Sequence, residues 1–171
     1  MNSNIKKMTM TALFTALVCV ATLIIQIPVP ATNGYIHPGD ALIFVAAVFL
    51  GARYGLVAGG LGSALADLIS GYAFWAPWTF IIKAIMGFAV GSIARYQRGK
   101  LFTWRNVLAM LLGVCIMVAG YLIVSSTMQG GWAAAVTSVP ANIVQGVGGM
   151  ILFFIVGYPL DRVDIQKYIS K

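Results

Sequence analysis

Six apolar segments follow one another along this chain, and their spacing constrains the fold more than any single motif. They are approximately residues 8–27, 39–50, 54–70, 77–95, 107–128 and 139–160. Only 9% of the 171 residues are charged, whereas a soluble domain carries roughly 25%. A straight span of a bilayer needs about 20 apolar residues. The pattern therefore predicts an all-α bundle of six transmembrane helices in one domain, residues 1–171. The second segment is short for a span, and we expect it to be tilted, extended by its flanks or partly inserted.

The basic residues lie almost entirely in alternate connections. Ten of the eleven lysines and arginines precede the first segment, join the second to the third or the fourth to the fifth, or follow the sixth. The other connections, residues 28–38, 71–76 and 129–138, contain no lysine or arginine. The positive-inside rule then places both termini in the cytoplasm of a multi-pass cell-membrane protein. This placement accounts for the net charge of +7 without a nucleic-acid partner.

Charged residues also occur well inside two apolar segments: Asp67 in the third and Lys83 in the fourth. A charge at the centre of a membrane helix costs about 2.5–3.5 kcal/mol or more, so such residues usually face a partner, a cavity or a ligand. Helix length places both in the outer half of the membrane, as the third segment runs outward and the fourth returns. They indicate a polar binding site, or a pair that only neutralises its own charges.

Further polar and aromatic residues are expected at the same outer end. They are Asn33, Tyr35, His37 and Asp40 from the first outer loop, Tyr72, Trp75 and Trp78 from the second, and Asn142 and Gln145 from the sixth segment. Each has a structural alternative. The tryptophans fit an interfacial aromatic belt, the two amides fit contacts between helices, and Asp40 after His37-Pro38-Gly39 fits a helix N-cap.

Small residues predict where helices approach closely. The glycines of the third, fourth and sixth segments fit packing within the bundle. In the first segment Thr9, Ala12, Ala16 and Cys19 form one narrow stripe, which fits either internal packing or the docking of a partner helix. We expect Cys19 and Cys115 to be buried small hydrophobes, because their spacing does not fit a metal site.

Three classes of membrane protein could contain such polar residues: a transporter subunit, an enzyme and an assembly subunit. A substrate-binding transporter subunit explains polar groups and aromatic walls gathered at one end. A membrane enzyme needs a nucleophile with a base, paired carboxylates or a metal cluster, and no such motif is present, nor is a phosphate-binding loop for ATP. An assembly subunit without a ligand gives no reason for buried charges beyond packing. The sequence favours the first class, with no cofactor or metal.

Several motifs occur in a fixed order between residues 35 and 91. They are YIHPGDALIF at 35–44, LGARYG at 50–55, GGLGSALAD at 59–67, PWTFIIK at 77–83 and the Gly87–Gly91 pair. Together they resemble the S components of energy-coupling factor (ECF) vitamin transporters, in the riboflavin-type branch. Ala12-Leu-Phe-Thr-Ala16 is similar to the Ala-x-x-x-Ala motif on the first helix of these proteins.

The resemblance implies a six-helix subunit that captures a vitamin outside the cell. It implies docking, through the Ala12 and Ala16 stripe, on a transmembrane coupling subunit that two cytoplasmic ATPases drive, and toppling of the loaded subunit in the membrane. A carboxylate (Asp67 or Asp40) with Lys83 and stacking aromatics suits a small ring of the hydroxymethylpyrimidine or pyridoxine type. Riboflavin is the alternative vitamin.

Overall fold

The computed structural model describes residues 3–30, 34–128, 130–165 and 167. Six long or medium helices carry the fold: α1 (Ser3–Ile24), α2 (Gly39–Leu50), α3 (Ala52–Ile69), α4 (Ala76–Ile93), α5 (Trp104–Met128) and α7 (Val139–Arg162). The short helix α6 (Trp132–Ala135) and the 3₁₀ turn η2 (Val136–Ser138) lead into α7. The predicted segments coincide with the six helices to within a few residues, and the all-α prediction is confirmed.

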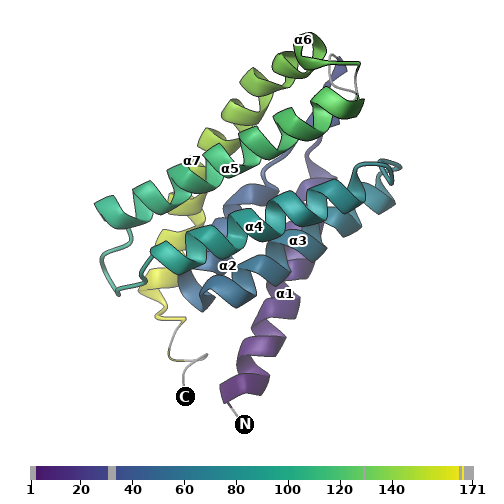
Figure 1. Cartoon of the computed structure of the whole chain (residues 1–171). Coiled ribbons are helices and arrows are strands. Elements are labelled where there is room, and N and C mark those ends of the chain that lie inside the picture. The colour runs from purple at the N-terminus through teal and green to yellow at the C-terminus, as the bar shows by residue number, and fades with distance from the viewer. Residues whose placement is uncertain (1–2, 31–33, 129, 166, 168–171) are drawn as a thin grey trace.

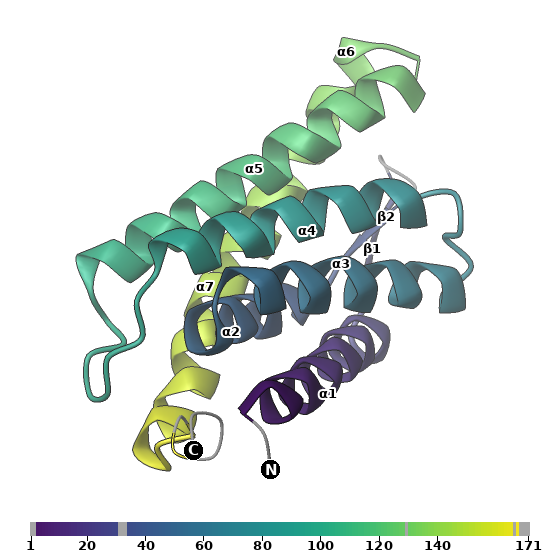
Figure 2. The same ribbon diagram turned by 60° about the horizontal axis from the view of Figure 1, so that its bottom comes forward.

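Two short strands were not predicted. Strand β1 (Ile27–Val29) pairs in antiparallel fashion with β2 (Gly34–Ile36), with Ile27 opposite Ile36. In Figure 2 this hairpin lies behind α3 and α4, toward the end at which these two helices are connected. It delivers Tyr35 and His37 to that end of the bundle.

Helices α1, α3, α4 and α5 lie side by side in that order, and α2 and α7 pack across them (Figures 1 and 2). Helix α2 is the centre of the core, because every residue except Leu42 is buried and it contacts α1, α3, α4 and α7. Among the described residues, four stretches are long and apolar enough to cross a membrane: Ile5–Ile24, Ala76–Ile93, Trp104–Met128 and Trp132–Arg162. Helix α2 has only 12 residues, which is shorter than the roughly 20 residues that a straight span needs, and it lies in the interior of the bundle.

Small residues allow the close approach of α3 and α4, as predicted for the glycines. A Cβ added at Gly55 would lie 2.7 Å from the carbonyl oxygen of Gly87, and one at Gly59 would lie 2.7 Å from that of Lys83. The two backbones therefore touch along this face, which fixes the depth of Lys83 relative to α3. The prediction for the cysteines is half right: Cys19 is buried, whereas Cys115 is exposed on α5, where it faces away from the core.

This packing predicts a strong difference between two alanine substitutions. Gly87→Ala should lower the free energy of unfolding by about 1–3 kcal/mol, as overpacked cores do, because the new methyl group meets the backbone of Gly55. Gly148→Ala is the control, since nothing lies within 4 Å of a Cβ there, and it should be neutral or stabilising because alanine favours a helix. Unfolding in detergent measures both, and equal stabilities would contradict the close α3–α4 contact.

Candidate functional site

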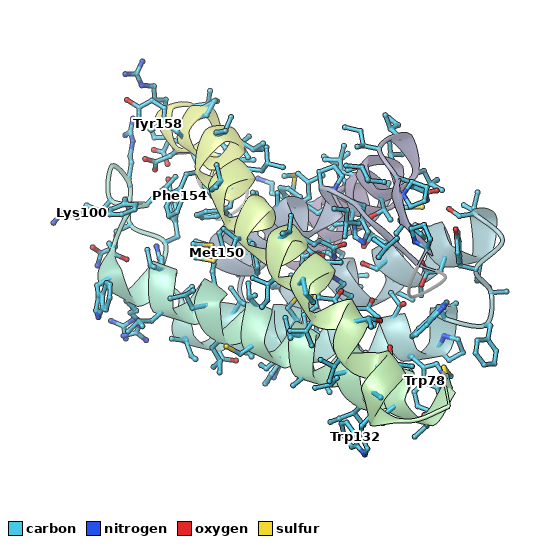
Figure 3. All side chains as sticks on the ribbon, turned by 90° about the horizontal axis from the view of Figure 1, so that it is seen from above. Trp78, Lys100, Trp132, Met150, Phe154 and Tyr158 are labelled. Carbon is cyan, nitrogen blue, oxygen red and sulfur yellow. The ribbon has the colours of Figure 1, made fainter. Side chains whose placement is uncertain are left out.

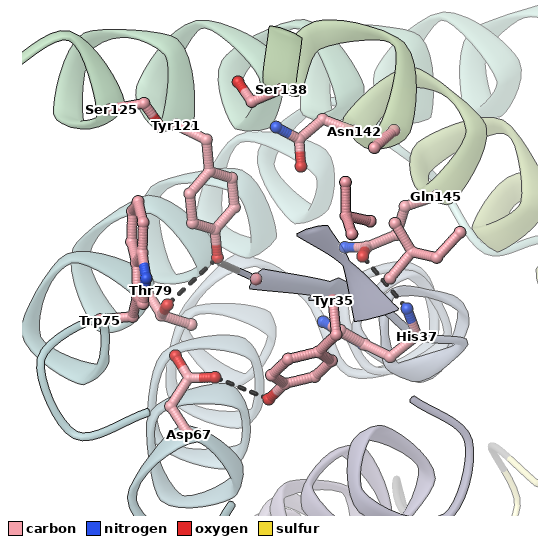
Figure 4. Close-up of a pocket in the computed structure, with 14 residues that line it drawn as sticks. Tyr35, His37, Asp67, Trp75, Thr79, Tyr121, Ser125, Ser138, Asn142 and Gln145 are labelled. Atoms are coloured by element: carbon pink, nitrogen blue, oxygen red, sulfur yellow. Dashed lines mark hydrogen bonds between the residues drawn. The ribbon is translucent and has the colours of Figure 1, made fainter. Parts of the chain in front are cut away.

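A cavity opens where the β1–β2 hairpin, the ends of α3 and α4, and the facing ends of α5 and α7 meet (Figure 4). Its volume is about 70 Å³. The lining residues are Val29, Gly34, Tyr35, Ile36, His37, Asp67, Trp75, Thr79, Tyr121, Ser125, Ser138, Ala141, Asn142 and Gln145. Polar and aromatic side chains from six elements thus surround one small space.

Asp67 is the one carboxylate among the described lining residues. The hydroxyl of Tyr35 donates to its Oδ1 at 2.7 Å (Figure 4). Its other oxygen, Oδ2, is buried and receives no hydrogen bond within the described part of the chain. A buried acceptor without a donor costs about 1–3 kcal/mol, more when it is charged. The cavity therefore holds an acceptor that a ligand donor would satisfy.

Aromatic rings form two of the cavity walls. Trp75 and Tyr121 meet edge to face with their ring centroids 6.2 Å apart, and the Tyr121 hydroxyl donates to Oγ1 of Thr79 at 3.2 Å. Tyr35 packs on Tyr72 with centroids 4.9 Å apart. A flat ring between such walls gains contact area and favourable ring geometry.

A buried ion pair lies behind the cavity. Nζ of Lys83 is 2.5 Å from Oδ1 of Asp40, and both side chains are fully buried. The same ammonium group contacts the sulfur of Met117 at 2.9 Å and lies 5.7 Å from the ring centre of Tyr121. The alternative in which Lys83 neutralises Asp67 is therefore wrong, because Lys83 pairs with Asp40.

Gln145 joins the cavity wall to this ion pair. Its Nε2 donates to Oδ2 of Asp40 at 2.9 Å, and its Oε1 accepts from the backbone N–H of His37 at 3.2 Å. The N-cap prediction for Asp40 is also wrong. Helix α2 already begins at Gly39, no side chain caps it, and the Asp40 carboxylate turns inward to Lys83 and Gln145.

His37 is held in a defined protonation state. The backbone N–H of Gly39 donates to its Nδ1 at 3.2 Å, and the Thr22 hydroxyl lies at the same distance from that atom. Nδ1 is therefore an acceptor, so the proton of the neutral ring is on Nε2. Burial is the main cause that lowers the pKa of His37 to about 4. The Asp40 carboxylate opposes this shift and the Lys83 ammonium adds to it.

This lowered pKa gives a pH dependence with a definite sign. A histidine in the unfolded chain binds its proton near pH 6.5, whereas the folded ring does so only near pH 4. Stability is therefore complete above pH 6.5 and falls as the pH decreases toward 4. The variant His37→Asn retains a hydrogen-bond acceptor at this position. The melting temperatures of parent and variant should differ at pH 7, and this difference should shrink as the pH falls from 6.5 toward 4. Parallel curves would show that His37 is not the group responsible.

The predicted site residues separate into four groups. Those that line the cavity are Tyr35, His37, Asp67, Trp75, Asn142 and Gln145. Asp40 and Lys83 lie behind it. Tyr72 packs on Tyr35 outside the lining, and Trp78 is 41% exposed, in keeping with a position at the membrane interface. Asn33 lies outside the described residues.

Four polar lining residues were missed: Thr79, Tyr121, Ser125 and Ser138. A signal was present for three of them. Thr79 lies one turn before Lys83 on the same face of α4, and Tyr121 and Ser125 are four residues apart on α5, directly after the apolar stretch 107–120. Within the described residues no group of three or more His, Cys, Asp and Glu side chains has the arrangement of a metal site.

The stripe on α1 borders an apolar groove between α1 and α3, with a volume of about 730 Å³. Ala12, Ala16 and Cys19 line this groove, the two alanines being exposed and Cys19 buried. Thr9 is exposed and lies outside the groove lining, and its hydroxyl donates to the Ile5 carbonyl at 3.0 Å.

Known proteins resemble the chain over between about half and nearly all of its length. The profile of the family described as "ECF-type riboflavin transporter, S component" matches residues 2–162. An uncharacterized protein of Pyrococcus woesei from the gap 3′ region is 40% identical over 145 residues, which cover 85% of this chain and 95% of that protein. The thiamine precursor transporter HmpT of Lactococcus lactis subsp. cremoris is 33% identical over 171 residues, 99% of this chain and 96% of HmpT. A UPF0397 protein of Streptococcus pneumoniae is 33% identical over 87 residues, about half of each chain.

Proposed function

Because the chain belongs to the integral membrane family of ECF-type riboflavin transporter S components, we propose that it binds one small heteroaromatic vitamin or vitamin precursor for uptake. The ligand we favour is of the hydroxymethylpyrimidine type, with pyridoxine as its nearest chemical relative. The family is one of transporter subunits and not of enzymes. The single observation that carries the proposal is the buried Oδ2 of Asp67, which has no hydrogen-bond partner among the described residues, in an aromatic-walled cavity.

The chemistry of the cavity suits an aminopyrimidine. Oδ2 of Asp67 can accept a hydrogen bond from an exocyclic amine or a protonated ring nitrogen. The rings of Trp75 and Tyr121 provide walls for a flat ligand, and the hydroxyl and amide groups of Ser125, Ser138 and Asn142 provide partners for a hydroxymethyl group.

The size of the cavity favours a small ligand over riboflavin. At about 10–15 Å³ for each water position, 70 Å³ corresponds to roughly five waters, which is close to the scale of a single substituted ring. Riboflavin, with three fused rings and a sugar chain, would require the walls to separate. The printed name of HmpT, a thiamine precursor transporter, supports the same ligand class.

Uptake would follow from the placement of the site. We place both termini in the cytoplasm with six membrane-embedded helices, so that the vitamin enters from outside past residues 28–38 and 71–76. The partners would be a transmembrane coupling subunit, docked at Ala12 and Ala16, and two cytoplasmic ATPase subunits. The loaded subunit would topple to release its vitamin inside.

Asp67→Asn tests the proposal directly. Affinity for hydroxymethylpyrimidine should fall about 10- to 150-fold, the worth of a hydrogen bond to a charged group. Asp164→Asn is the matched control, because it removes a carboxylate that pairs with Arg98 and Lys167 and leaves the cavity unchanged. Calorimetric titration of the purified variants measures both affinities. Full affinity in Asp67→Asn would remove this residue from the site.

A thermal-shift panel identifies the ligand class. Hydroxymethylpyrimidine should raise the melting temperature of the parent in a saturable way, since a ligand that binds only the folded state stabilises it. A shift with riboflavin alone would overturn the small-ligand assignment and retain the family role. No shift with these two compounds, pyridoxine, pyridoxamine, thiamine, pantothenate or biotin, on folded protein, would favour an assembly subunit.

A further inference from the structure

A second cavity lies at the opposite end of the bundle from the vitamin site. It has a volume of about 560 Å³ and opens between the α4–α5 connection, residues 94–103, and the last turns of α7. Its walls are mostly apolar and include Leu101, Phe102, Phe154, Ile155 and Tyr158. Figure 3 shows Lys100, Phe154 and Tyr158 together at this end, and Trp78 and Trp132 at the other.

Hydrogen bonds hold the walls of this groove in place. The carboxylate of Asp161 accepts from the Tyr96 hydroxyl at 2.7 Å and from the backbone N–H of Gly99 at 2.9 Å. The side chain of Asn106 is fully buried, accepts from the Arg95 N–H and donates to the Leu101 carbonyl, both at 2.9 Å. The connection is thus fastened to α7 and to the start of α5, so the groove is a built feature of the fold.

Two exposed cations, Lys100 and Arg162, are sequence neighbours of lining residues of the groove. Lys100 follows the lining residue Gly99 and is exposed. Arg162 is also exposed, donates to the Tyr158 hydroxyl at 2.8 Å and lies 4.8 Å from the centre of that ring. No described carboxylate lies within ion-pair distance of either one, in contrast to Arg98, which pairs with Asp164 at 3.2 Å. Next to the apolar groove the chain thus carries two exposed positive charges without an acidic partner among the described residues.

Strongly exposed aromatic side chains place this end at a membrane interface. Phe102 is 79% exposed and Trp104 74% exposed, and aromatic residues gather where hydrocarbon meets the headgroups. At that depth a groove with an apolar floor and neighbouring basic residues has the chemistry of a phospholipid: an acyl chain for the floor and a phosphate for the cations.

We propose that this groove binds one anionic phospholipid, with an acyl chain along Phe154 and Ile155 and its phosphate at Lys100 and Arg162. Two cations with no acidic partner favour a lipid with net negative charge over a zwitterionic one. The proposal depends on the membrane location of the chain and not on the identity of its vitamin.

Native mass spectrometry of the detergent-purified chain, with equimolar phosphatidylglycerol and phosphatidylcholine, tests the proposal. The parent should retain one phosphatidylglycerol in preference to phosphatidylcholine. Lys100→Gln/Arg162→Gln should reduce that preference roughly 30-fold, at about a factor of five for each basic residue near the headgroups. Lys6→Gln/Lys7→Gln removes the same charge from α1 and should leave the preference intact.

Two further measurements distinguish lipid binding from a folding defect of the double variant and from a site for soluble phosphate. Lys100→Gln alone changes an exposed side chain and should reduce the preference about fivefold, so a folding defect of the double variant would not hide the effect. Binding of glycerol 3-phosphate as tightly as of the lipid would show a soluble phosphate site and overturn the proposal. Equal retention of both lipids by the parent, or an equal loss in the α1 control, would also overturn it.

Discussion

Lys83→Met is expected to lower the free energy of unfolding by about 3–5 kcal/mol, because it leaves a fully buried carboxylate without its cation. Lys83 and Asp40 are both 0% exposed and 2.5 Å apart, so water cannot replace the lost ammonium group. Gln145 alone would then donate to Asp40. Chemical unfolding in detergent measures the loss.

Adding a second substitution, at Asp40, shows whether the instability of Lys83→Met comes from the lost ion pair or from the unpaired carboxylate that it leaves behind. In Lys83→Met/Asp40→Asn neither charge remains, and most of the stability should return, since well-packed neutral residues often replace a buried ion pair without loss. Arg98→Met is the control for removing a cation. Its side chain is 58% exposed and pairs with Asp164 at 3.2 Å, and such surface pairs contribute about 0–1 kcal/mol. If the double variant is as unstable as the single one, the cost lies in packing around residue 83.

Ala12→Trp and Ala16→Trp are each expected to stop vitamin uptake while leaving vitamin binding unchanged. Both alanines are exposed and line the groove of about 730 Å³ between α1 and α3. An indole there fills the space that we assign to the helices of the coupling subunit. The vitamin cavity has no lining residue in common with this groove, so its shape should persist.

Leu17→Trp provides the matched control for this pair. It introduces the same side chain on the same helix, at a position that is 39% exposed and outside the groove lining. Uptake of radiolabelled vitamin by cells, together with binding by the purified chain, gives the two readings. Loss of binding in the alanine variants would show that the stripe packs internally. Equal loss of uptake in Leu17→Trp would show that α1 tolerates no bulk anywhere.

The positions of the helices were predictable because lipid imposes a demand on each one separately. A membrane helix must be apolar along its own length, so residues 107–128 and 139–160 marked α5 and α7 without knowledge of their neighbours. The end of the bundle that holds the polar groups was predictable for a similar reason, since turns alternate between two ends. Six of the predicted residues line the cavity as a result.

The hydrogen bonds and ion pairs at the cavity end of the bundle were not predictable. They depend on the position of each helix along its own axis relative to its neighbours. Asp40 and Lys83 are 43 residues apart in the chain, and nothing local distinguishes Asp40 from Asp67 as the partner of Lys83. The short α2 lies wholly in the core, where its second residue reaches the middle of α4. Asp67 instead accepts a hydrogen bond from Tyr35, which lies on the β1–β2 hairpin, and the sequence pattern did not predict this hairpin.

The sequence by itself therefore determined the membrane class and the helical segments, because these depend on composition along each segment. The order of its motifs determined the family resemblance, and the alternation of its connections determined the end of the bundle at which polar groups collect. Only the tertiary structure decided that Lys83 pairs with Asp40 and that Gln145 joins this pair to the cavity wall. It also decided that one oxygen of Asp67 has no partner in the part of the chain that the structure describes. The physical reason is that hydrogen bonds and ion pairs form only between groups about 3 Å apart. Which groups come that close depends on how α2, α3 and α4 pack against one another at their glycines.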